Sequence, residues 1–333
     1  MTRLDSLRPP ALWDSSQEKY KDWLHLNVFD HETGAVGLIN ASLHGSPFDP
    51  RSRVLGTTVV NVPDRGWIGN VEVTGFDEAT IGSSAIGLSR SGIAVDATKG
   101  AILASVRDSQ DGFSATFSAE PVTAPIDIEE HLSLADGWIS WYVVPRLRTS
   151  GNWTINGQEF DLANASVYHD HNWGRWHWGD DFGWEWGCFL TSGGTSFVLA
   201  RTTDRAHRKL NRLSLFVQSG TERRNFSGAS IDFSYMGELS CVSRRLPGAL
   251  AALHQDRACP RLPAQLKLSA YDGIDEIDLT FTAREGLQLI AADPIALNGF
   301  TFIHEIVGEF SYRGEIGAAA ISGSGLGIFE YVD

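Results

Sequence analysis

Residues 168–174 read YHDHNWG, and residues 183–187 read GWEWG. These two stretches and the residues between them hold five of the chain's eleven tryptophans, a density that is not typical of a plain hydrophobic core. If the first stretch is extended, its side chains alternate between two faces. Tyr168, Asp170 and Asn172 then bring a phenol, a carboxyl and an amide to one face, within reach of one another.

The opposite face of this predicted strand carries His169, His171 and Trp173. Two imidazoles at positions i and i+2 point the same way and can bind a metal together, with His177 or Asp181 as a third ligand. The alternative is that the histidines stabilise the local fold through hydrogen bonds. Because this spacing is common, we predict no metal site and assign these residues, with the amide on the other face, to a structural motif.

The second stretch aligns Trp184 and Trp186 on one face of a strand, with Glu185 on the other. A carboxyl such as Asp170 in an apolar pocket has its ionised form disfavoured by desolvation. This can raise its pKa by up to ~3–5 units, so that it donates a proton near neutral pH. Each tryptophan ring can stabilise a developing positive charge by about 0.5–2 kcal/mol. These residues predict acid chemistry on an alkene; the alternative is that Asp170 caps a turn between domains and the tryptophans are core.

Composition bounds the class of protein. The 333 residues suffice for about two domains, and 42% hydrophobic with 20% charged residues is ordinary for a globular chain. A net charge of −14 and a pI near 5.1 argue against nucleic acid or an anionic membrane surface as partner. Three cysteines without a CxxC spacing indicate neither a disulfide framework nor a zinc site. With no signal sequence or apolar span in view, we expect a cytoplasmic protein without an integral membrane segment.

The rest of the chain repeats short segments rich in Val, Ile, Thr and aromatic residues, separated by Gly, Pro, Asp or Asn. Regular spacing of this kind predicts an all-β, antiparallel sandwich or barrel. We place a domain change after residue 165, so the domains are 1–165 and 166–333. One helical turn is expected at 247–255. Predicted strands cover residues 23–29, 35–43, 54–60, 67–73, 79–88, 92–97, 101–107, 113–119, 138–147, 160–167, 183–187, 196–200, 213–218, 230–236, 266–270, 277–283, 287–292, 301–312 and 325–331.

The hairpin around residues 183–200 repeats features of the hairpin around residues 22–39. A shift of 161 residues places Trp23 on Trp184 and His25 on Trp186. The match covers one hairpin, and it predicts a diverged internal duplication, with two β domains of one design.

The heptad at 168–174, followed by Trp184 and Trp186, resembles the lipocalin-like superfamily. That group includes carotenoid 1,2-hydratase (hydroxyneurosporene synthase), the AttH-like proteins, kievitone hydratase-like proteins and the decalin-forming Diels–Alderases. Trp23 near the start and GIFEY at 327–331 add to the likeness. The resemblance implies two lipocalin-like antiparallel β-barrel or sandwich domains packed side by side, with a hydrophobic ligand pocket at or near their interface.

In the carotenoid hydratases a Tyr-x-Asp pair is implicated in catalysis, and it matches Tyr168 and Asp170 here. Those enzymes also carry a His-x-Trp pair about a strand earlier, where this chain has Trp141-Tyr142 without a histidine. The departure argues against carotenoid hydration itself. It leaves a related reaction on another polyene, polyketide or terpenoid-like substrate.

We therefore predict a cofactor-independent hydratase or cyclase of hydrophobic unsaturated natural products. Asp170 would donate a proton that Tyr168 orients, and His25, Glu185 or His304 would activate water. The aromatic lining of the substrate site would come from Trp23, Trp141, Trp184 and Trp186.

Two alternatives use the same pocket. A Diels–Alderase-type pericyclase would fold a linear polyene and polarise a carbonyl, with Asp170 as a hydrogen-bond donor or a structural residue. A non-catalytic carrier would bind a hydrophobic ligand inside a barrel. Oligomeric state leaves no readable mark in the sequence.

Overall fold

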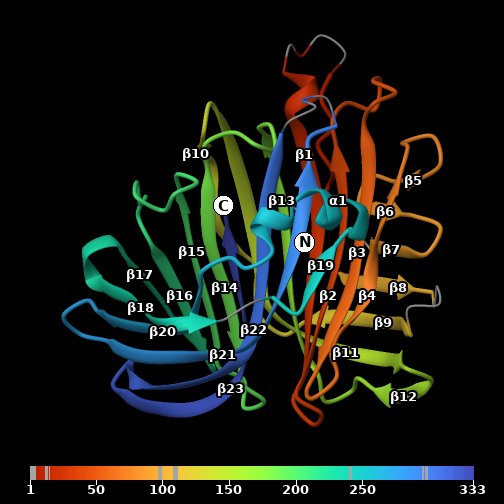
Figure 1. Ribbon diagram of the computed structural model, residues 1–333. Coiled ribbons are helices and arrows are strands. Elements are labelled where there is room, and N and C mark those ends of the chain that lie inside the picture. Colours follow the sequence, from red (N-terminus) through yellow and green to blue (C-terminus); the bar gives the residue numbers. More distant parts are fainter. Residues whose placement is uncertain are drawn as a thin grey trace. The chain divides into compact units, whose positions relative to one another are not determined.

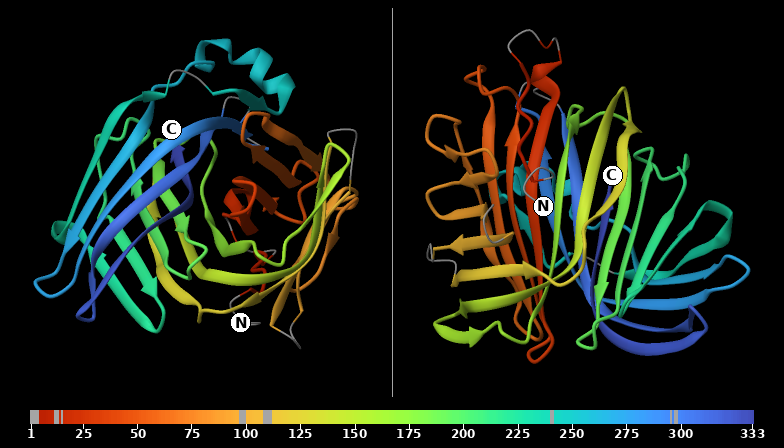
Figure 2. Two further views of the ribbon diagram at one scale, coloured as in Figure 1. Left: turned by 90° about the horizontal axis from the view of Figure 1, so that it is seen from below. Right: turned by 180° about the vertical axis from the view of Figure 1, so that it is seen from behind.

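A computed structural model describes residues 5–11, 14, 16–96, 100–107, 112–239, 242–294, 296 and 299–333. The chain forms two compact units, Met1–Asp180 with Ala292–Phe300, and Asp181–Ala291 with Thr301–Asp333. Each unit is built on one curled sheet, and nearly all strand pairs are antiparallel (Figure 1; Figure 2). The predicted all-β fold with two β domains is confirmed.

The sheet of the first unit contains, within the described residues, thirteen strands: β1 (Tyr20–Asp30), β2 (Ala35–His44), β3 (Arg53–Val62), β4 (Gly66–Thr74), β5 (Thr80–Ile81), β6 (Ala85–Gly87), β7 (Ser91–Asp96), β8 (Ala101–Val106), β9 (Phe113–Pro121), β10 (Ile126–Leu134), β11 (Gly137–Ile155), β12 (Gln158–Asp161) and β13 (Ser166–Arg175). They are hydrogen-bonded in the order β4-β3-β2-β1-β13-β11-β9-β8-β7-β6-β5, and β10 and β12 also pair with β11. A 3₁₀ turn, η1 (Gln17–Lys19), precedes β1.

The sheet of the second unit contains, in the part of the chain that is described, ten strands: β14 (Gly183–Leu190), β15 (Ser196–Thr203), β16 (Ser214–Ser219), β17 (Glu222–Ser227), β18 (Ile231–Leu239), β19 (Arg244–Leu246), β20 (Leu262–Tyr271), β21 (Glu276–Ala292), β22 (Phe300–Ile316) and β23 (Ala319–Val332). Their order is β17-β16-β15-β14-β23-β22-β21-β20-β18, and the short β19 pairs with β21 in parallel. The helical segments are η2 (Gly228–Ser230), α1 (Gly248–Leu253) and η3 (Gln255–Arg257). No helix in the described chain is long and apolar enough to cross a membrane.

The predicted helical turn at 247–255 is confirmed by α1, whereas some strand bounds were wrong. The strand predicted at 160–167 is two strands, because residues 162–165 form a turn between β12 and β13. The strand predicted at 79–88 is likewise split into β5 and β6. Conversely, the segments 277–283 and 287–292 belong to one long strand, β21.

The strand β1 shows how the first sheet organises its two faces. Leu24, Leu26 and Val28 point to one side and belong to the main hydrophobic core of the unit. The residues between them, such as His25 and Asn27, point to the other side because side chains alternate along a strand. Both sets are buried, so each face of this central strand is covered.

The unit boundary lies later in the chain than the expected division after residue 165. The strand β13 pairs with β1 on one side and β11 on the other, so it completes the first sheet. Its last residues pack tightly: a Cβ at Gly174 would lie 2.2 Å from the carbonyl oxygen of Trp138 on β11. The heptad at 168–174 therefore belongs to the first unit, which extends to Asp180.

The two sheets share a topology that fits the expected internal repeat. In each unit the first strand pairs with the next strand and also with the last strand of the unit: β1 with β2 and β13, and β14 with β15 and β23. In register, His25 lies opposite Asp170 in the first unit, and Trp186 lies opposite Glu330 in the second. Each unit therefore carries a carboxylic acid at the corresponding position beside its first strand.

Candidate active site

The central strands of the first sheet bring the predicted catalytic residues onto one face. Across β13, Asp170 lies opposite His25 on β1, and Asn172 lies opposite Trp23 on β1 and Trp141 on β11. Directly opposed residues of antiparallel strands project to the same side. The predicted site residues of the first unit thus share this face: Tyr168, Asp170, His25, Trp23 and Trp141.

The carboxyl group of Asp170 is buried, with 7% of the residue exposed. Its Oδ1 accepts a hydrogen bond from the side-chain amide of Asn172, two residues along the same strand. The phenol-bearing Tyr168, two residues the other way, is fully buried. Asn172, predicted as structural, is therefore in direct contact with the predicted catalytic acid.

The imidazole of His25 is held as a neutral ring. Burial lowers the pKa of His25 to about 4, although the hydrogen bond to Asn27 opposes this shift. Its Nε2–H donates to Asn27 Oδ1 at 2.9 Å, and its Nδ1 accepts from Asn40 Nδ2 at 3.3 Å. Because both ring nitrogens are engaged, His25 presents a fixed, uncharged ring to the residue opposite it, Asp170.

The histidines on the other face of β13 form buried pairs with carboxylates. His169 Nε2 lies 2.9 Å from Asp5 Oδ1, and its Nδ1 donates to the main-chain oxygen of His25 at 2.9 Å. His171 Nε2 lies 2.7 Å from Asp22 Oδ1. All four side chains are fully buried. These contacts tie the N-terminal segment and β1 to β13. Within the described residues, no three His, Cys, Asp or Glu are grouped to hold a metal ion.

In the second unit, Trp184 and Trp186 on β14 share a face of the sheet with a pair of acids on the neighbouring strands β23 and β22. Trp186 lies opposite Glu330 on β23, and Glu330 lies opposite Glu305 on β22. The indole N–H of Trp184 donates to Glu330 Oε1. Burial raises the pKa of Glu330. The protonated form of Glu330 is therefore favoured beside an indole.

The sequence reasoning missed the pair of Glu305 and Glu330. A signal was present, because the internal repeat brings Glu330 close to the position of Asp170. The resemblance also included the segment at 327–331, but nothing in the sequence pointed to Glu305 as its neighbour. The pairing of β22 with β23 is what brings the two carboxyls together.

Glu185 projects from the opposite face of β14 and is fully buried in a charge network. Its Oε2 lies 2.5 Å from Arg201 Nη2, and its Oε1 lies 2.8 Å from His207 Nδ1. Burial by itself would raise the pKa of Glu185, but the hydrogen bond from His207 and the charge of Arg201 outweigh it, so the pKa is lowered. Glu185 is therefore an ionised carboxylate that is already paired with Arg201.

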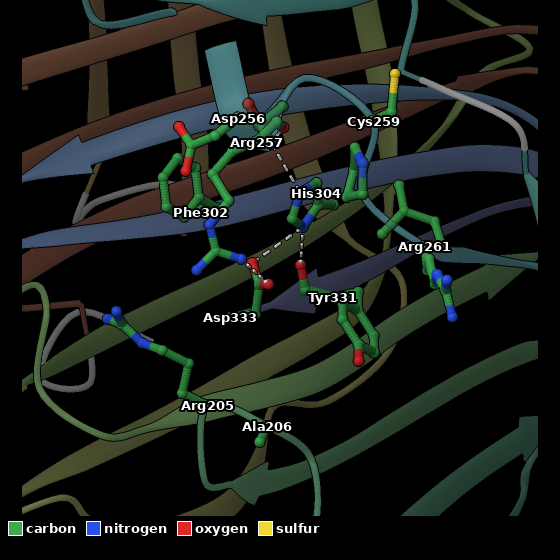
Figure 3. Close-up of a pocket in the computed structure, with 13 residues that line it drawn as sticks. Arg205, Ala206, Asp256, Arg257, Cys259, Arg261, Phe302, His304, Tyr331 and Asp333 are labelled. Carbon is green, nitrogen blue, oxygen red and sulfur yellow. Dashed lines mark hydrogen bonds and ion pairs between the residues drawn. The ribbon is translucent and has the colours of Figure 1, made fainter. Parts of the chain in front are cut away.

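His304 lies on the same face of its sheet as Glu185, because both are opposite Tyr331. It lines a pocket of about 320 Å³ in the second unit (Figure 3). Its Nδ1–H donates to the main-chain oxygen of Tyr331 at 3.0 Å, and its Nε2 accepts from Gln288 Nε2 at 3.0 Å. Burial lowers the pKa of His304, so this ring too is neutral near pH 7.

The fold defined by these two sheets is shared with several solved structures. No family model matches the sequence, and no curated protein sequence matches it. The AttH-type protein of Nitrosomonas europaea superposes with a TM-score of 0.67 at 14% identity, covering 98% of this chain and 99% of that one. Kievitone hydratase from Nectria haematococca gives 0.62 at 12% identity, with 98% and 96% covered.

A further similar structure is CghA in complex with Sch210972, with a TM-score of 0.59, 12% identity, and 94% and 88% of the chains covered. At sequence identities of 12–14%, the structural similarity establishes the fold alone. This chain thus has the two-unit, lipocalin-like β fold of these proteins, and the resemblance predicted from residues 168–174 is confirmed at that level.

Proposed function

We propose that this chain is a cofactor-independent enzyme that hydrates or cyclises C=C bonds of a hydrophobic small molecule. The observation that carries the proposal is the buried carboxyl of Asp170, on a sheet face shared with Tyr168, Trp23 and Trp141 and hydrogen-bonded by Asn172. Two proteins of the same fold support it: kievitone hydratase, and CghA, a Diels–Alderase.

In the hydration reaction, a carboxylic acid transfers its proton to one alkene carbon, and the π electrons form the new C–H bond. The other carbon becomes a carbocation, which electron-rich indole faces such as those of Trp23 and Trp141 stabilise by about 0.5–2 kcal/mol each. Water then forms a C–O bond to the cation and returns a proton to the carboxylate. The product is an alcohol, and the acid is regenerated.

Two acids are candidates for the proton donor. Asp170 has the position implied by the family motif. Glu330 lies opposite Glu305, accepts the indole N–H of Trp184, and has a pKa that burial raises. A carboxyl that keeps its proton near neutral pH is the form needed for general acid catalysis. In a cyclisation, the same donor would protonate the alkene, and an internal double bond would form a C–C bond to the cation in place of water. The new cation would then lose a proton to the carboxylate, which gives an isomer and regenerates the acid.

The reaction is tested by incubation with lycopene, kievitone and a linear polyene in H₂¹⁸O, followed by mass spectrometry. Hydration adds one labelled water, whereas cyclisation gives an isomer of unchanged mass. D170N should slow hydration by about 10²–10⁴-fold, the usual contribution of a positioned acid. D161N, at the end of the exposed-edge strand β12, is the matched control and should retain the wild-type rate.

The outcomes separate the candidates. If E330Q loses activity and D170N keeps it, Glu330 is the proton donor. A reaction that survives both substitutions with the fold intact is pericyclic and runs by substrate folding. If all three probes are recovered unaltered from tight complexes, the chain is a carrier and the proposed enzymatic function is wrong.

A further inference from the structure

The pocket that contains His304 is built entirely from the second unit (Figure 3). Its volume of about 320 Å³ is near the lower end of the ~300–1,000 Å³ that small-molecule sites usually occupy. The floor is formed by His304 and Gln288, which are almost fully buried. The side chains of Tyr331 and Phe302 add aromatic surface to the wall.

Three guanidinium groups line this pocket, and they come from three separate segments of the chain. Arg205 follows β15, Arg257 ends η3, and Arg261 precedes β20 (Figure 3). The acidic side chains in the lining are Asp256 and Asp333, so the side chains leave one positive charge in excess. In a chain with a net charge of −14, such a gathering of arginines is unexpected by composition.

Contacts within the pocket hold Arg257 and the floor residues in place. Arg257 Nη1 lies 3.5 Å from Asp333 Oδ2, and its guanidinium carbon lies 5.1 Å from the centre of the Phe302 ring, so the side chain is held in place. The polar groups of the floor already have hydrogen-bond partners, because Gln288 donates to the main-chain oxygen of Arg257 and to His304 at 3.0 Å each. Among the described residues, Arg261 makes no hydrogen bond or ion pair and can meet a ligand directly.

We propose that this pocket binds a small organic acid, whose carboxylate or phosphate is held by Arg205, Arg257 and Arg261 while its apolar body lies against Tyr331 and Phe302. Guanidinium groups bind carboxylate and phosphate alike through paired N–H donors. The proposal therefore specifies the negative charge and the planar or tetrahedral oxygens of the head group, and the experiment distinguishes the two. The volume exceeds what an oxyanion alone would fill, so the ligand has a body. The proposal does not depend on the reaction proposed above.

Cys259 provides a direct reporter, because it is an exposed thiol in the pocket wall. Its alkylation by iodoacetamide is followed by peptide mass spectrometry, which separates it from Cys188 and Cys241. Phenylacetate, phenyl phosphate and the neutral phenylacetamide serve as probes, and calorimetric titration gives the dissociation constants. At least one anion should protect Cys259 saturably and bind about tenfold or more tightly than the amide, as expected for charge-assisted hydrogen bonds.

The variant R261A should weaken binding of the anion by about tenfold or more. R208A is the matched control, since its side chain is 81% exposed and lies outside the pocket lining. The tighter of the two anions identifies the head group as carboxylate or phosphate. The proposal is overturned if neither anion protects Cys259, if the amide protects equally well, or if R208A weakens binding as much as R261A does.

Discussion

The histidine whose protonation should destabilise the first unit most is His44. Its ring is buried, with 5% of the residue exposed. Its Nδ1 accepts the indole N–H of Trp178 at 3.1 Å, and its Nε2 lies 3.1 Å from Ser42 Oγ. An indole nitrogen can only donate, so Nδ1 must be without a proton. Burial, helped by the charge of Lys21, lowers the pKa of His44 to about 3.

This shift predicts a specific loss of stability in acid. In the unfolded chain a histidine has a pKa of about 6.5, so below that value the unfolded state binds the proton and the folded state does not. The contribution of His44 is therefore fully present above pH 6.5 and is lost as the pH falls toward 3. Each pH unit in this window costs about 1.36 kcal/mol, which gives about 2.7 kcal/mol between pH 6.5 and pH 4.5.

The measurement compares urea unfolding of the wild type and H44Q at pH 7 and pH 4.5, followed by tryptophan fluorescence. Glutamine does not titrate, so the stability difference between the two proteins should shift by about 2.7 kcal/mol in favour of H44Q at the lower pH. H131Q, which changes an exposed histidine, is the control. A difference between wild type and H44Q that is the same at both pH values would refute the reasoning. Burial lowers the pKa of His25 as well, so His25 also destabilises the fold in acid. Its contribution to the free energy of unfolding is the same in both proteins and cancels in their difference.

Two further substitutions test a buried ion pair and the side-chain packing of the second unit. E185A removes the carboxylate that Arg201 contacts inside the sheet and should cost about 3–5 kcal/mol, seen as a lower Tm in calorimetry; an unchanged Tm would show that the network contributes no stability. G327A would place a Cβ 2.4 Å from Cδ1 of the buried Phe189 and should cost about 1–3 kcal/mol in urea unfolding. At Gly248 a Cβ has no atom within 4 Å, so G248A should be tolerated, and equal losses for both variants would contradict the tight packing.

The alternation of residues along the chain was enough to predict the β class, most of the strands and the contents of their faces. It separated Tyr168, Asp170 and Asn172 from the histidines between them, and the register of β13 agrees with that division. This works because the period of two is a local property of an extended backbone and needs no knowledge of the neighbouring strand. The acid-bearing motif and the resemblance it carries were likewise readable from the sequence.

The neighbours of each strand were decided by the tertiary structure. The pairing of β1 with β13 joins residues about 145 positions apart and sets His25 opposite Asp170 between two asparagines, which fix its tautomer. The same long-range pairing assigns the heptad to the first unit. In the second unit the pairing of β22 with β23 sets Glu305 opposite Glu330, and the folded chain brings three arginines from separate segments to the pocket that His304 lines. Hydrogen bonds between distant strands form through backbone groups that are alike in nearly every residue. The side-chain pattern therefore predicts the two faces of each strand, but only the folded sheets show which strands are neighbours and in which register.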